Sequence, residues 1–417
     1  MDKYLVTASF RRDGNYVFSE ANRFGNFPAI GVAWKINEET FMQSIEAISQ
    51  LKLRASYGIT GNSSVPLQFS SIWKGQANNI VYSLGDGKNY AQGATINSSF
   101  DPNIQWETTK QFDIGLDLGL FEDQLTLSLG YYDRKNEDLL TYVPVPLSTG
   151  IGGPFDNPGN ILKNTATASN KGFEVDIAYQ GNAGGLRYSF SANAAYNKNK
   201  VVSLGEGSSF QRGGVNGGNL ATKTDKDQPI GSFFGYVVDH VAIDQSDVDS
   251  YNQIAQQATG DASAVYQTGL LAGDIIFKDI DGDGQLTNKD LTFLGSPIPK
   301  WNYGANVNLA YKNFDFMLSL YGISDVKIWN DLKYWTEGTT RPFNASADLV
   351  SRWRTEGDIS EYPKAGQNAT GSKNLRPSDR FVENGSYLRL RNVTLGYNIP
   401  VANAGSVNKV FSSLRII

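Results

Sequence analysis

Residues 278–290, KDIDGDGQLTNKD, carry the side chains of this chain that are best suited to hold a metal ion. Asp279, Asp281 and Asp283 occupy positions one, three and five of a calcium loop, and Gly284 supplies the sharp turn at position six. Oxygen ligands at alternate positions suit a hard cation, because Ca²⁺ accepts roughly six to eight oxygens in a flexible geometry. The pattern predicts a calcium site.

The remaining ligand positions of this loop are also filled by residues that offer oxygen. Gln285 presents its backbone carbonyl at position seven, Thr287 stands at nine and Asp290 at twelve. Asp290 is shorter than the usual glutamate, which weakens bidentate closure. The alternative is a polar surface turn, because DGDG is good turn chemistry in its own right. No pair of helical patterns flanks the loop, so we expect a structural clip that orders a long loop and no sensor that opens a groove.

Composition excludes most other chemistry. The chain has no cysteine, and its single histidine, His240, has no histidine partner for a zinc site, so we expect it to be a polar loop residue. Lys+Arg 37 against Asp+Glu 42 gives a net charge of −5 without a basic patch, which argues against nucleic-acid binding. The acidic residues define no separate apolar cleft, so we expect no enzyme.

Strict alternation of apolar and polar residues dominates the rest of the chain. In LKLRASYGIT, residues 51–60, the leucines, Ala55, Tyr57 and Ile59 fall on one face and the polar residues on the other. A period of two is typical of strands with one apolar and one polar face. The same pattern recurs at 4–10, 30–36, 112–120, 125–131, 173–179, 186–196, 305–311 and 314–320.

Connections between these predicted strands alternate between short and long. The short ones are 121–123, 181–185, 312–313 and 37–50, the last with one amphipathic turn and Asn37 as its expected N-cap; the long ones are about 61–105, 136–170, 198–301 and 324–385. Outer-membrane barrels have this pattern, with periplasmic turns at one end and extracellular loops at the other. The polar face would line the lumen, with Lys52, Arg54, Asp113, Asp117 and Arg187.

The fold class predicted is therefore all-β: an antiparallel transmembrane outer-membrane β-barrel with long extracellular loops. About ten complete strands and the start of another are present, so we expect further strands before residue 1 and after residue 417. Trp34, Trp106 and Trp301 lie at strand ends, where interfacial aromatic girdles form.

Several long segments resemble the SusC/RagA family of TonB-dependent outer-membrane transporters. SDRFVENGSYLRLRNVTLGYNIP (378–400) is similar to a late-barrel signature of that family, and residues 2–39 resemble a mid-barrel hairpin. NKGFEVDI (170–177), PIGSFFGYVVD (229–239) and GDIIFKDIDGDGQLTNKDLTFLGSPIPKWNYG (273–304) follow in the family's order.

The resemblance implies that residues 1–417 are a barrel portion, with 198–301 a long extracellular loop region that holds the acidic loop 279–290. It also implies a plug and a TonB contact outside this chain, contact with outer-membrane lipid, a SusD-like surface lipoprotein as partner, and import of oligosaccharides or peptides. The alternative function is a calcium-stabilised surface adhesin or secreted β-protein that binds without transporting.

Two further expectations concern single residues. Trp73, Trp329, Trp335 and Trp353 fall in predicted outer loops, where they would contact substrate or partner, or pack within the loops. Within 386–399, Leu388 and Leu390 share one phase of the alternation, whereas Val393 and Leu395 share the other. A β-bulge near Arg391–Asn392 would keep both sets on the lipid face.

Overall fold

The structure is a computed structural model that describes residues 2–64, 73–74, 81–84, 89–92, 95–96, 98–149, 160–205, 210–215, 219–338, 344–366, 373–400 and 414–416. The chain divides into two compact units. Unit 1 comprises Met1–Ser209, Lys300–Ile323 and Tyr387–Ile417, and unit 2 comprises Phe210–Pro299 and Ser324–Ser386. Among the described residues, no helix is both long and apolar enough to cross a membrane.

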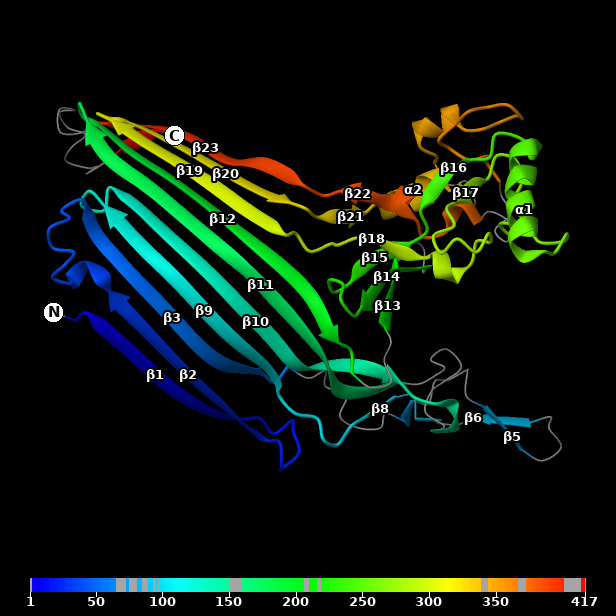
Figure 1. Cartoon of the computed structure of the whole chain (residues 1–417), viewed down its shortest axis with the longest axis horizontal. Coiled ribbons are helices and arrows are strands. Elements are labelled where there is room, and N and C mark those ends of the chain that lie inside the picture. Colours follow the sequence, from blue (N-terminus) through cyan, green and yellow to red (C-terminus); the bar gives the residue numbers. More distant parts are fainter. Residues whose placement is uncertain are drawn as a thin grey trace. The chain divides into compact units, whose positions relative to one another are not determined.

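Unit 1 is one large antiparallel sheet of long, tilted strands (Figure 1). Its strands are hydrogen-bonded in the order β1 Tyr4–Gly14, β2 Phe24–Lys35, β3 Ile48–Asn62, β9 Glu107–Leu120, β10 Leu125–Pro144, β11 Asn160–Ala183, β12 Leu186–Ser203, β19 Trp301–Tyr311, β20 Phe314–Ser324, β23 Tyr387–Ile399 and β24 Leu414–Ile416. Short elements accompany it: η1 Ile36–Glu38, β4 Trp73–Lys74, β5 Val81–Leu84, β6 Asn89–Gln92, β7 Thr95–Ile96, β8 Ser98–Phe100 and η2 Leu147–Thr149. Ten long strands and one short terminal strand match the predicted number.

The register places like side chains opposite one another on each face. Leu53 and Leu129 both pair with Leu116, so apolar residues form rows across β3, β9 and β10. One residue along, Lys52 and Ser128 both pair with Asp117, and these rows are polar. Since a slip of one residue would exchange the two faces, the alternation itself fixes the register.

The tight turns have the backbone conformation that short connections need. Residues 121–123 all have φ between 54° and 61°, although none of them is glycine, whereas Gly184 and Gly185 supply positive φ to the next turn. Asn37 is not a helix N-cap: its Oδ1 accepts a hydrogen bond from the Leu51 backbone N–H, 3.2 Å away. The Asn37 prediction is wrong because 37–50 folds as a 3₁₀ turn and irregular turns, with no helix to cap.

The predicted bulge is present. In the pairing of β20 with β23, Ser319 lies opposite Asn392 and Leu320 lies opposite Leu390, so Arg391 is the extra residue. The register shift keeps Leu390 and Val393 on one face of the sheet, where both are exposed.

Two of the three strand-end tryptophans pack against neighbouring aromatic rings, and their place at a membrane interface stays a prediction. Trp301 packs against Phe173 and Tyr196 with ring centroids 5.4 and 5.0 Å away, and Trp34 stacks on Tyr4. Trp106 is different, because only 8 % of it is exposed and it packs between Phe18 and Phe27 in a small buried cluster. Its girdle role was wrongly predicted; aromatic rings from β2 and from the link before it cover the indole.

Unit 2 contains short sheets and helices (Figure 1). Its elements are β13 Phe210–Val215, β14 Asn219–Asp225, β15 Ser232–Gly235, β16 Val238–Val241, α1 Gln245–Thr259, β17 Ile275–Phe277, η3 Asn288–Asp290, β18 Thr292–Gly295, β21 Lys327–Trp329, α2 Asp331–Glu337, η4 Ala347–Ser351, η5 Lys373–Leu375, η6 Asp379–Phe381 and β22 Val382–Asn384. The fully buried strand β17 lies at its centre, with α1 packed on Ile276 and the ring of Tyr236 against Phe277. This core positions the acidic loop, which follows β17 directly.

Candidate functional site

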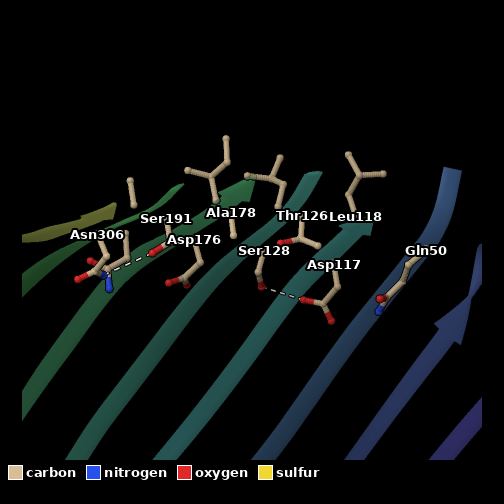
Figure 2. Close-up of a pocket in the computed structure, with 13 residues that line it drawn as sticks. Gln50, Asp117, Leu118, Thr126, Ser128, Asp176, Ala178, Ser191 and Asn306 are labelled. Atoms are coloured by element: carbon tan, nitrogen blue, oxygen red, sulfur yellow. Dashed lines mark hydrogen bonds between the residues drawn. The ribbon is translucent and has the colours of Figure 1, made fainter. Parts of the chain in front are cut away.

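A polar trough of about 290 Å³ crosses the polar face of unit 1 (Figure 2). Six neighbouring strands each contribute a side chain to it: Gln50 from β3, Asp117 from β9, Ser128 from β10, Asp176 from β11, Ser191 from β12 and Asn306 from β19. They meet because every second residue of a strand points to the same face and the register aligns neighbouring strands.

Asp117 is the charged centre of one end of this trough. Ser128 Oγ donates a hydrogen bond of 2.8 Å to its Oδ1, and Lys52 Nζ and Arg54 Nε lie 3.4 and 3.3 Å from its Oδ2. The predicted lumen residues Lys52, Arg54 and Asp117 are therefore brought together. Asp113 lies four residues from Asp117 along β9, on the same face, where Ser56 and Gln111 donate to it.

A second trough of about 410 Å³ continues from the first and shares Asp176, Asn193 and Asn306 with it. Ser319 Oγ donates to Asn306 Oδ1 over 2.8 Å, and Arg391, the bulged residue, also lines this trough. Arg187 lines a wider trough of about 690 Å³ with Asp315. The polar face thus offers carboxylates, carboxamides, hydroxyls and guanidinium groups, which bind polar solutes by hydrogen bonds. Alternation predicted this face, but not which side chains share a trough.

In unit 2, the first three aspartates of the acidic loop converge. Each of Asp279, Asp281 and Asp283 offers a carboxylate oxygen, and these oxygens lie within 4.8 Å of one another. Asp279 Oδ1 and Oδ2 also accept hydrogen bonds from the Gly282 and Gly284 N–H groups, both over 2.7 Å. The loop backbone therefore curls around Asp279 and turns these carboxylates to the same side.

Asp290 closes the loop from the far end. It is fully buried; Oδ2 accepts from the Thr287 N–H over 2.6 Å, and Oδ1 accepts from the N–H groups of Ile280 (2.8 Å) and Asp281 (3.4 Å). Burial alone would raise the pKa of Asp290, but these backbone donors outweigh it and hold the pKa below its ordinary value. The hydrogen bonds of Asp290 therefore link the two ends of the loop.

The other two predicted ligands have local partners. Thr287 Oγ1 caps the 3₁₀ turn η3 by accepting from the Lys289 N–H over 3.1 Å, and Gln285 Nε2 donates to the Val265 carbonyl. Lys289 Nζ lies 3.8 and 3.6 Å from Asp281 and Asp283. The donor set, carboxylate and carbonyl oxygens without nitrogen or sulfur, fits calcium.

Two loop tryptophans are engaged in packing. Trp329 stacks on Phe381 with ring centroids 5.4 Å apart, and Trp353 Nε1 donates to the Ile243 carbonyl over 2.9 Å. Trp335 Nε1 donates to Asp331 Oδ2, and the side chain of Trp73 lies outside the described residues. These contacts favour loop packing for Trp329 and Trp353, while substrate or partner contact stays a prediction.

Comparisons with known proteins give the family. Residues 1–415 match the family model described as TonB dependent receptor-like, beta-barrel. Two curated relatives from Formosa agariphila are TonB-dependent receptor P3, 31 % identical over 412 residues, and TonB-dependent receptor P26, 32 % identical over 413 residues; each alignment covers 97 % of this chain. TonB-dependent receptor SusC of Bacteroides thetaiotaomicron is 27 % identical over 95 % of the chain.

Among solved structures, the chain is similar to the RagAB peptide transporter, with a TM-score of 0.75 and 21 % identity over 99 % of this chain. The chain spans 38 % of the length of the two Formosa relatives and 41 % of the RagAB chain. These proteins are called receptors and transporters, in agreement with the expectation that the chain is not an enzyme. The chain belongs to the family of TonB-dependent receptor-like β-barrels and forms part of an outer-membrane barrel.

Proposed function

We propose that this chain is the wall and outer-loop portion of a SusC-like importer, which takes up oligosaccharides or peptides with a SusD-like lipoprotein and draws energy from TonB. The observation that carries the proposal is the family match over residues 1–415. The likeness to the RagAB peptide transporter supports the peptide class, and the oligosaccharide class is what the resemblance to the SusC/RagA family implies.

The two faces of unit 1 would have different roles in such a protein. The apolar face, with residues such as Ile114 and Leu129, meets lipid, and the paired strands leave few backbone groups to desolvate there. The polar face then lines the path of the solute. Its troughs offer many weak hydrogen-bonding groups and no covalent chemistry, which suits passage because a solute held by several modest contacts is also released.

Affinity purification of the complete gene product from outer membranes tests the partner. We expect a lipoprotein in stoichiometric amount, identified by mass spectrometry. A barrel recovered alone, from a gene that encodes no plug, would overturn the importer and favour an adhesin.

Growth on a single oligosaccharide or peptide source tests transport. We expect Asp176→Arg, which reverses a charge shared by two troughs, to slow uptake at unchanged membrane levels. Val175→Leu, the neighbouring residue on the apolar face, serves as the matched control, because Val175 pairs with Leu129 and lines neither trough. Equal uptake by both variants would show that the polar face does not meet the solute.

We further propose that residues 279–290 hold a structural Ca²⁺, with Asp279, Asp281 and Asp283, the Gln285 carbonyl, Thr287 and Asp290 as its ligand set. The convergence of three carboxylates within 4.8 Å supports this proposal. The bound ion would offset the repulsion among these carboxylates, which Lys289 offsets only in part.

Calorimetric titration with Ca²⁺ tests the site. We expect one site in the wild-type protein and none in Asp281→Ala, which removes a ligand oxygen; the Asp281 carboxylate accepts only one local hydrogen bond, so the loop should still fold. Asp249→Asn, on the exposed surface of α1, should bind as the wild type does. Equal heats from all three proteins would contradict a site in this loop.

A further inference from the structure

His240, the single histidine of the chain, lies between two carboxylates. It belongs to strand β16; its Nδ1 is 3.0 Å from Asp239 Oδ2, and its Nε2 is 2.9 Å from Asp247 Oδ2 in the first turn of helix α1. An ionised carboxylate only accepts hydrogen bonds. Both ring nitrogens therefore act as donors at once, and only the doubly protonated imidazolium can do this.

Further donors reach the same two carboxylates. Tyr251 Oη donates to Asp239 Oδ2 over 2.6 Å, and the Ile243 N–H donates to Asp247 Oδ2 over 3.0 Å. Lys278 Nζ, just beyond β17, lies 3.8 Å from Asp239 Oδ1. With the proton on His240, two cations face two carboxylates; without it, one carboxylate faces a ring nitrogen lone pair.

Tyr251 of α1 is also titratable and lies beside the imidazole, with ring centroids 5.9 Å apart; burial and its hydrogen bond to Asp239 raise its pKa, so it stays neutral. The partner of His240 on β17 is the apolar Ile276, and Asp244 is turned to the N–H of Asp247 as the N-cap of α1. The plain polar loop residue expected from the sequence is thus an ion-paired link between a strand and a helix.

We propose that His240 is a pH-sensitive clip that fastens helix α1 to strand β16 when it is protonated and loosens the helix when it loses its proton. Burial alone would lower the pKa of His240, but the hydrogen bonds that the ring donates to Asp247 and Asp239 outweigh it, so that the folded pKa lies above 6.5. The stabilisation that protonated His240 gives the folded state is complete below pH 6.5 and is lost as the pH rises through the folded pKa.

Loss of the His240 proton should also affect the acidic loop, because the loop packs against α1. Gly284 lies so close to the helix that an added Cβ would be 2.5 Å from Ala258 Cβ. Ala255 of the same helix is fully buried, and Leu286 of the loop packs against the cluster that contains it. Loosening α1 therefore loosens the loop, and alkaline conditions favour a less ordered outer region.

Nuclear magnetic resonance of the complete protein in detergent tests the proposal, with histidine labelled at Cε1 and His240→Gln used to assign the signal. We expect the His240 pKa to exceed 6.5 in the wild type and to fall by about one unit in Asp247→Asn. Asp249→Asn, two residues further along α1, removes a carboxylate that faces Gln245 and should leave the value unchanged. A wild-type pKa at or below 6.5 overturns the proposal.

Hydrogen exchange of α1, corrected for the intrinsic effect of pH, provides the second readout. We expect protection of the helix to decline through the measured His240 pKa in the wild type and to be independent of pH in His240→Gln. The dependence on pH is the criterion, so a variant that is merely less stable remains informative. Parallel pH profiles in both proteins would refute the clip.

Discussion

Replacing Asp290 by alanine tests whether the acidic loop is built around this carboxylate before any metal is bound. The side chain is fully buried and accepts two short hydrogen bonds, from the N–H groups of Thr287 (2.6 Å) and Ile280 (2.8 Å). In Asp290→Ala both donors lose their partner in a place where water replaces it poorly. A hydrogen bond to a charged group contributes roughly 1.5–3 kcal/mol, so the two together predict a loss of roughly 3–6 kcal/mol.

The assay is native-state hydrogen exchange of strand β17 in unit 2, with and without Ca²⁺. Asp281→Ala is the matched comparison, because Asp281 accepts one local bond of 3.3 Å and lies at the surface. In chelator, we expect Asp290→Ala to lose most of the protection and Asp281→Ala to lose less than about 1 kcal/mol. In Ca²⁺ at a hundredfold excess over Kd, the wild type gains about 2.7 kcal/mol and neither variant does.

Protonation of Asp290 in acid should weaken the same hydrogen bonds that Asp290→Ala removes. The pKa of Asp290 is held below 3.8, so its stabilisation is complete above 3.8 and is lost as the pH falls through the lower folded value. Two results would refute this account. The first is protection of β17 in Asp290→Ala that stays, in chelator, within about 1 kcal/mol of the wild-type value; the second is a loss of protection in Asp281→Ala as large as that in Asp290→Ala.

Three further substitutions follow from the packing. Gly284→Ala should lower the free energy of unfolding, measured by thermal unfolding, by about 1–3 kcal/mol more than Gly282→Ala does. The backbone φ is positive at both glycines (82° and 76°), but only a Cβ at 284 would meet a side chain of α1, at 2.5 Å. Equal losses of stability in the two variants would contradict this contact. Arg380→Ala should lower the stability measured by hydrogen exchange by about 3–5 kcal/mol, because it leaves the buried carboxylate of Glu337, 2.7 Å away, without its cation. Lys333→Ala, which breaks a more exposed ion pair, should lower it by less than about 1 kcal/mol. Deleting Arg391 removes the extra residue and leaves Leu390 and Val393 in one phase of an unbroken alternation, so we expect a heat-modifiable barrel on gels. Deleting Thr394, which is not an extra residue, moves Leu395 to the other face and should prevent assembly; equal assembly of both deletions would contradict the role of the bulge.

The strands of unit 1 were predictable because lipid on one face and water on the other impose a period of two. The same reasoning located the bulge at Arg391, where the phase of the alternation changes. It failed between 136 and 170, where β10 continues to Pro144 and β11 begins at Asn160. The ladder hydrogen bonds continue there, but the alternation becomes irregular, so the sequence suggested a long loop.

Residues that act through distant partners were not predictable. Trp106 is buried by Phe18 and Phe27, which precede it by about eighty residues or more, and no local pattern announces that contact. His240 gains its role from Asp247, which helix α1 turns back toward β16, and the sequence predicted no helix there. The acidic loop was found because its ligand spacing is local, whereas the hydrogen bonds of Asp290 to the loop backbone were not.

The two units owe their stability to different interactions. The described strands of unit 1 are paired with one another, and in a membrane its apolar face needs no protein cover. Unit 2 has only short sheets and small buried clusters, so buried and partly buried charges join its segments: Asp290 closes a loop, Arg380 joins η6 to α2, and His240 joins β16 to α1. Each of these interactions depends on ionisation, which apolar packing does not. Changes in pH or in cation concentration should therefore reorder unit 2 while the strand pairing of unit 1 persists, and regulation of this protein is to be sought in unit 2.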